Sequence, residues 1–98
     1  MPFTATSVNR PGSLRAEIDV NGRHAIVTDE PADLGGEDTA PAPHELLPAM
    51  LASCISTMVT LYARRKGWEL GEVRVDVTYD HDSAPRRLEA DVILPDGL

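Results

Sequence analysis

One long apolar segment constrains this chain more than any other feature. Between His44 and Lys66, apolar residues recur at intervals of three and four, the spacing of one helix face. They are Leu47, Met50, Leu51, Cys54, Ile55, Met58, Val59 and Tyr62, and Leu46 and Leu61 widen the apolar surface. The spacing predicts a helix over about 44–66, capped by Gly67. Because Pro48 lacks an N–H group, we expect a kink or a late helix start there.

Alternating patterns lie on both sides of this segment. Residues 14–20 alternate between apolar and polar, and Asn21-Gly22 supplies a two-residue hairpin turn, so we predict a hairpin over about 12–28. A second hairpin is predicted over about 72–94, with its turn at 81–86. The intervening segment, 29–43, is rich in proline and glycine and is predicted to be a loop that rims a pocket or merely connects. Pro95-Asp96-Gly97 is a further turn signal near the end.

The order ββαββ predicts an α+β fold with antiparallel hairpins flanking one long central helix. Ninety-eight residues favour a single domain, 1–98, whose core is small. A helix that is apolar over much of its circumference cannot be covered by one small sheet. An intimate homodimer is therefore the simplest expectation.

The net charge and the N-terminal residues bear on which partners and which cellular compartment we expect. The net charge of −7 argues against nucleic acid and anionic membrane surfaces, since both are bound through dense positive charge. The first residues show no signal peptide, and residues 46–63 are interrupted by Pro48 and carry hydroxyl side chains. We expect a soluble cytoplasmic protein with no nucleic-acid or membrane partner.

Cys54 is the single cysteine, which excludes an intrachain disulfide framework and a cysteine-rich zinc site. A mid-helix cysteine on an apolar stripe commonly packs as a small hydrophobic residue. A reactive thiol there would need a nearby cation, because a mid-helix position lacks the stabilisation found at a helix N-terminus. The same argument rejects a redox motif in Cys54-Ile55-Ser56-Thr57. Spacing alone leaves the structural and the reactive interpretations open.

Other site signatures are weak. His24, His44 and His81 fall on a predicted strand, a helix start and a turn, and no pair has the spacing of metal ligands. No nucleotide-binding glycine motif or serine-hydrolase motif occurs. The residues therefore predict neither a metal site nor a bound cofactor.

An ordered series of short motifs resembles the OsmC/Ohr family. The series runs through Asp29-Glu30-Pro31, Leu34-Gly35-Gly36-Glu37-Asp38, Pro41-Ala42-Pro43-His44-Glu45-Leu46-Leu47 and Leu51-Ala52-Ser53-Cys54. Its continuation, Tyr62-Ala63-Arg64-Arg65-Lys66-Gly67-Trp68, looks like the OsmC branch. The match covers roughly residues 25–80.

This resemblance implies an intertwined homodimer whose sheets wrap around central helices. It also implies reduction of organic hydroperoxides or hydrogen peroxide, in oxidative-stress defence, by the cysteine at position 54. In the family a second cysteine then forms a disulfide that an external dithiol reduces. The chain departs from this pattern because it stops before the segment that would carry the second cysteine.

The residues that activate the thiolate match the family less closely. His44 occupies the place of the family's acidic residue, and Glu45 comes one position later. Arg15 is the better match for the thiolate-stabilising arginine and Arg23 the poorer one. The resemblance thus implies Cys54, Arg15, His44 and Glu45 as candidate catalytic residues, with a peroxide substrate and an external thiol reductant. The alternative is a non-catalytic dimer that binds an apolar small molecule or senses oxidation.

Overall fold

The computed structural model describes residues 2–82 and 84–95. Its contacts divide the chain into two compact units, one ending at Leu46 and the other beginning at Leu47. Each unit is described by itself. The prediction that residues 1–98 form one domain stays a prediction.

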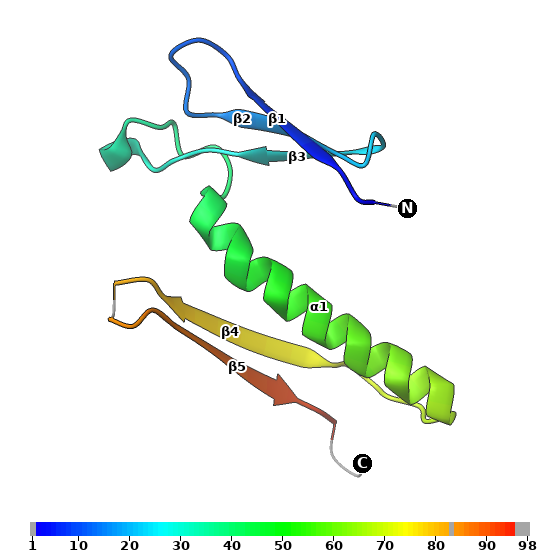
Figure 1. Ribbon diagram of the computed structural model, residues 1–98. Helices are drawn as coiled ribbons and strands as arrows, with labels where there is room; N and C mark the ends of the chain where they lie inside the picture. Colours follow the sequence, from blue (N-terminus) through cyan, green and yellow to red (C-terminus); the bar gives the residue numbers. More distant parts are fainter. Residues whose placement is uncertain (1, 83, 96–98) are drawn as a thin grey trace. The chain divides into compact units, whose positions relative to one another are not determined.

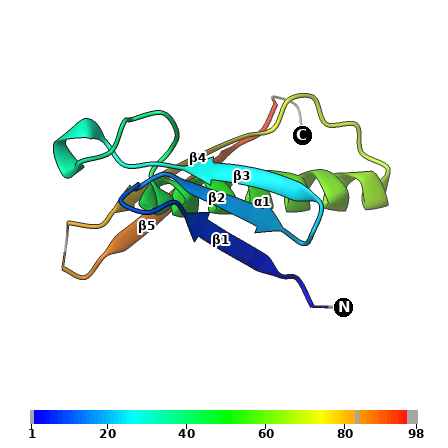
Figure 2. The same cartoon turned by 90° about the horizontal axis from the view of Figure 1, so that it is seen from above.

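A three-stranded antiparallel sheet forms most of the first unit. Its strands are β1 (Ala5–Asn9), β2 (Ala16–Val20) and β3 (His24–Thr28), and β2 lies between the other two (Figures 1 and 2). Asn21 and Gly22 have the predicted positive φ, 57° and 71°, but Val20 pairs with His24, so the β2–β3 loop has three residues, Asn21 to Arg23, and not the predicted two. Its closing hydrogen bond runs from the Arg23 N–H to the Val20 carbonyl, over 3.1 Å.

The loop after β3 is held by hydrogen bonds within the first unit. It contains a short 3-10 helix, η1 (Ala32–Leu34). The backbone N–H of Asp29 donates to the Pro41 carbonyl, and the N–H of Asp38 donates to the Glu30 carbonyl. At Gly36 a Cβ atom would overlap the Glu30 backbone. The backbones at Glu30 and Gly36 therefore lie so close together that only glycine fits at position 36.

Helix α1 (Pro43–Lys66) begins at a proline and ends at a glycine cap. Gly67, with φ 74°, directs its N–H to the Arg64 carbonyl, and the Trp68 N–H reaches the Ala63 carbonyl. This pair of bonds is a Schellman motif. At Pro48 the expectation of a late start was wrong, because the helix begins at Pro43 and runs through Pro48, and the alternative expectation of a kink stays a prediction.

The second unit joins most of α1 to a two-stranded hairpin. Strands β4 (Arg74–Asp80) and β5 (Arg87–Ile93) pair antiparallel, with Val77 opposite Ala90. Alternate residues of β4 are half-buried, whereas every residue of β5 is exposed. Figure 1 shows β4 on the side of the hairpin that is nearer to α1. The pattern agrees with a hairpin that meets the helix mainly through β4.

The predicted fold class is confirmed: an α+β chain with one long helix between antiparallel strand pairs in sequence order. The prediction missed β1, one of the two edge strands of the sheet, because Ala5–Asn9 is exposed throughout and carries no apolar alternation. The turn signal at 95–97 lies mostly outside the described residues. The homodimer stays a prediction.

Candidate functional site

Cys54 lies in the middle of α1, and its side chain is exposed. A cysteine that served only to fill a core would be buried. In the single chain its side chain is open to solvent, and solvent access is the first requirement for a reactive thiol.

Arg15 lies directly before β2, in the first unit, and its backbone is fixed on both sides. Its N–H donates to Ser13 Oγ over 3.1 Å, and its carbonyl accepts from Asn9 Nδ2 over 3.2 Å. The guanidinium donates from Nη1 to Thr39 Oγ1 over 2.6 Å. Among the described residues, no carboxylate forms an ion pair with Arg15. Its positive charge is thus held in place without being neutralised.

Asp29, at the end of β3, is a buried carboxylate with a relative exposure of 1%. Its Oδ2 accepts the Thr39 hydroxyl at 2.7 Å and the Thr39 N–H at 3.2 Å, and its Oδ1 accepts the Glu30 N–H at 2.8 Å. The hydrogen bonds from Thr39 and Glu30 lower the pKa of Asp29 to about 2, against the opposing effect of burial. Asp29 therefore carries a negative charge at neutral pH.

His44 and Glu45 lie in the first turn of α1, and both are exposed. Glu45 Oε1 accepts the Ala42 N–H over 3.0 Å. A glutamate at the third helical position that reaches back to the N-cap N–H is one half of a capping box. Glu45 thus has a structural task besides the orienting role that the resemblance implies.

The four predicted residues fall in different units. Arg15, His44 and Glu45 belong to the unit that ends at Leu46, and Cys54 belongs to the unit that begins at Leu47. Their assembly into one site stays a prediction.

The structure adds Asp29 and Thr39 to the candidate residues: Asp29 is part of a motif of the resemblance, but neither residue was predicted to belong to the site. They join Arg15 in one chain of hydrogen bonds. The available signal was a carboxylate at the end of an alternating strand, followed ten residues later by a threonine in the same proline-rich loop. Such a pair cannot be recognised as part of a site from the sequence, because loops of this composition commonly contain both residue types.

Among the described residues, no three His, Cys, Asp or Glu side chains gather as metal ligands would. Helix α1 is long and apolar enough to cross a membrane by length and composition, which the sequence argument had denied for residues 46–63. The central helix of a soluble protein passes the same test.

Comparisons with known proteins agree with the resemblance. The family model described as OsmC-like protein matches residues 35–97, a range that includes Cys54 and the β4–β5 hairpin. A crystal structure from Psychrobacter arcticus 273-4, provisionally named an osmotic stress induced and detoxification response protein, has a TM-score of 0.73 and 28% identity. The alignment covers 97% of this chain and 72% of that one. No curated protein matches.

Proposed function

Because the chain belongs to the OsmC-like protein family, we propose that it reduces organic hydroperoxides or hydrogen peroxide, with Cys54 as the attacking thiol. The name of the Psychrobacter protein, which includes a detoxification response, supports a role of this class. Oxidative-stress defence in the cytoplasm is the corresponding cellular role.

The observation that carries the proposal is the exposure of Cys54 on α1, inside the segment that the family model matches. In the single chain, exposure means that Cys54 does not fill the chain's own core, and the proposal requires that its sulfur stays accessible in the homodimer. A thiol that is neither buried nor paired in a disulfide is available for oxidation.

The first chemical step is a two-electron transfer. The Cys54 thiolate attacks one peroxide oxygen, an S–O bond forms and the O–O bond breaks. The departing alkoxide takes up a proton and leaves as the alcohol, or as water from hydrogen peroxide. The sulfur is oxidised to a sulfenic acid, and the peroxide is reduced.

Recovery of the thiol needs an external reductant, because reduction of a sulfenic acid takes two electrons. A thiol of a small dithiol attacks the sulfenic sulfur, forms a mixed disulfide and releases water. The second thiol of the dithiol then displaces the Cys54 thiolate, and the dithiol leaves as a cyclic disulfide.

Arg15 is proposed to stabilise the thiolate and the departing oxygen, with His44 or Glu45 as the orienting group. Arg15 fits this role because its guanidinium is held by Thr39 and not by a carboxylate. Arg23, in the β2–β3 turn, supplies the matched control, since it is an exposed arginine of the same unit.

The test is consumption of cumene hydroperoxide with dithiothreitol as the reductant. We expect turnover by the wild type, none above background with Cys54→Ser, a marked loss with Arg15→Ala and near-normal rates with Arg23→Ala. Mass spectrometry after one equivalent of peroxide should show a sulfenic acid at Cys54. Equal rates for the wild type and Cys54→Ser would overturn the proposal.

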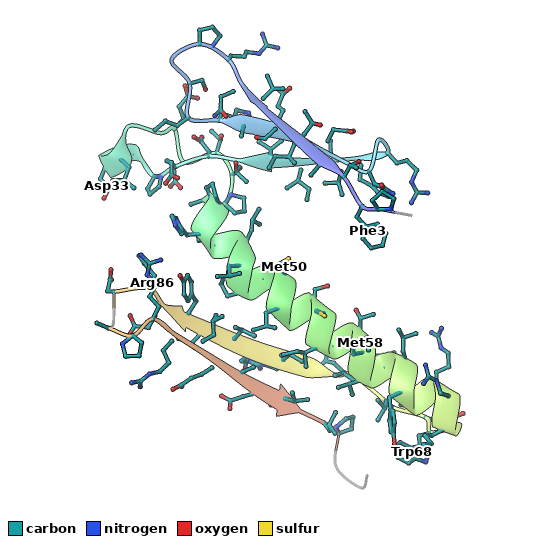
Figure 3. The ribbon with its side chains drawn as sticks, in the orientation of Figure 1. Phe3, Asp33, Met50, Met58, Trp68 and Arg86 are labelled. Carbon is teal, nitrogen blue, oxygen red and sulfur yellow. The ribbon has the colours of Figure 1, made fainter. Side chains whose placement is uncertain are left out.

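The proposed assembly is a homodimer that covers the apolar surface of α1. Among the described residues of the helix, only Ala63 is buried, while Met50 and Met58 are 64% and 60% exposed (Figure 3). Large apolar side chains exposed in a row mark a surface that another chain covers. Light scattering after gel filtration, in buffer without detergent, should give twice the mass of one chain. A monomer, or a protein that needs detergent, would contradict this assembly.

One observation favours the alternative, a binding or sensing protein. An open hollow of about 390 Å³ in the second unit is lined by Met58, Val59, Leu61, Tyr62 and Arg65. Its apolar lining and single arginine suit an apolar molecule with one negative charge. Binding of a fatty acid such as laurate by both the wild type and Cys54→Ser, with no peroxide turnover, would favour this function over the peroxidase.

A further inference from the structure

We propose that Asp29 and Thr39 are positioning residues, which hold the Arg15 guanidinium ready for an anionic reaction partner. The inference deepens the proposed function and rests on it. It concerns three residues of the first unit, Asp29, Thr39 and Arg15, which we call the Asp29–Thr39–Arg15 chain.

The direction of each hydrogen bond in this chain is fixed. The Thr39 hydroxyl has one proton, and it donates that proton to Asp29 Oδ2 over 2.7 Å. The lone pairs of the same oxygen therefore face Arg15 Nη1, which donates to it over 2.6 Å. A carboxylate that accepts from one side of a hydroxyl strengthens the oxygen as an acceptor on the other side.

The carboxylate at the start of the chain is itself fixed. The backbone N–H groups of Glu30 and Thr39 donate to its two oxygens, and the side chain is almost fully buried. The N–H of Asp29 is bound to the Pro41 carbonyl. Both ends of the loop thus restrain Asp29, and Asp29 in turn sets the direction in which the Thr39 oxygen points.

At the other end, Arg15 is restrained through its backbone by Asn9 and Ser13 and through Nη1 by Thr39. A guanidinium carries five donors in a planar fork. With one donor used by a neutral hydroxyl, the others remain for an anion that arrives from outside the first unit. A direct Asp29–Arg15 ion pair would have neutralised the charge, whereas an interposed threonine orients the guanidinium and leaves the charge available.

In the proposed reaction two anions would use these donors: the Cys54 thiolate and the oxygen that departs from the peroxide. Both carry charge that a fixed guanidinium stabilises better than a mobile one, because no reorganisation is needed at the moment of reaction. Arg15 is the group that would touch the reacting atoms. Asp29 and Thr39 act only through it.

The kinetic test is a double-mutant cycle with cumene hydroperoxide and dithiothreitol. Thr39→Val should lower kcat/KM by about tenfold to a hundredfold, the scale of losses caused by a misplaced catalytic group. Thr39→Ser restores the hydroxyl and should recover most of the rate, and Thr6→Val, an exposed threonine of β1, should leave it unchanged. In an Arg15→Ala background, Thr39→Val should have no further effect. A loss of the same size in that background would show a merely structural role and overturn the proposal.

A second readout does not depend on turnover. In ¹⁵N NMR spectra, the Arg15 guanidinium should give resolved, slowly rotating Nη signals in the wild type and in Thr39→Ser. Thr39→Val and Asp29→Asn should average them, while the control Asp33→Asn should not. If peroxide turnover is absent but these signals behave as expected, the proposed function fails and the positioning of Arg15 stands. Signals that are unaffected by Thr39→Val would overturn the positioning itself.

Discussion

In the unit that ends at Leu46, a buried carboxylate gathers three hydrogen bonds and ties a proline-rich loop to the end of a strand. In the described part of the unit that begins at Leu47, Ala63 is the one buried side chain, and large apolar residues stay exposed along α1 and β5. The first unit satisfies its polar groups internally. Both units leave apolar area uncovered, at Phe3, Val8 and Leu34 in the first and along α1 and β5 in the second, and burial of apolar area is the main driving force of folding. The two units therefore differ in their buried groups: the first buries a hydrogen-bonded carboxylate, whereas the described part of the second buries only Ala63.

The largest effect is expected from a charge placed on the exposed face of α1, which tests whether this face of the second unit is the homodimer interface. Met58→Glu should weaken a homodimer by about a hundredfold, because an unpaired carboxylate would be buried in each copy. Sedimentation equilibrium at several protein concentrations measures the effect, and Ser53→Glu on the same helix is the control. A dimer that tolerates Met58→Glu would show that this face is not the interface.

In the loop of the first unit, a substitution at Gly36 should lower the stability of the fold. Gly36→Ala places a Cβ atom against the Glu30 backbone, so the loop must shift, at a cost of about 1–3 kcal/mol of unfolding free energy. Gly71→Ala, whose Cβ would meet the Pro95 side chain at an ordinary 3.5 Å, is the matched control in the second unit. Urea unfolding of both variants measures the difference. Equal stability of the two variants would contradict the tight approach at Gly36.

Acid should weaken the first unit through Asp29. Its pKa is about 2 in the folded chain and 3.8 ordinarily, so its stabilising contribution is complete above about pH 4 and is lost as the pH falls toward 2. The melting temperature of the wild type should therefore fall more steeply from pH 4 to pH 2 than that of Asp29→Asn. Parallel curves would show that the carboxylate is not held as described.

Local structure could be predicted from the sequence, whereas hydrogen bonds between residues far apart in a loop could not. The helix, the Asn21-Gly22 turn and both hairpins follow from local periodicity and turn chemistry, which a sequence displays directly. Strand β1 was not predicted, because an exposed edge strand needs no apolar alternation. The roles of Asp29 and Thr39 were not predicted, because these residues are ten positions apart in a loop. Only the folded backbone brings the carboxylate, the hydroxyl and Arg15 within hydrogen-bond distance.

The smallest expected effect separates two tasks of Glu45. Glu45→Ala removes the acceptor of the Ala42 N–H and should cost about 0.5–1 kcal/mol of unfolding free energy. Glu45→Gln keeps an oxygen acceptor but removes the charge, so its unfolding free energy should stay near that of the wild type. If Glu45 also orients the reactive groups, Glu45→Gln should still lower kcat/KM for cumene hydroperoxide. A Glu45→Gln variant with wild-type stability and wild-type turnover would confine Glu45 to capping and leave His44 as the candidate orienting group.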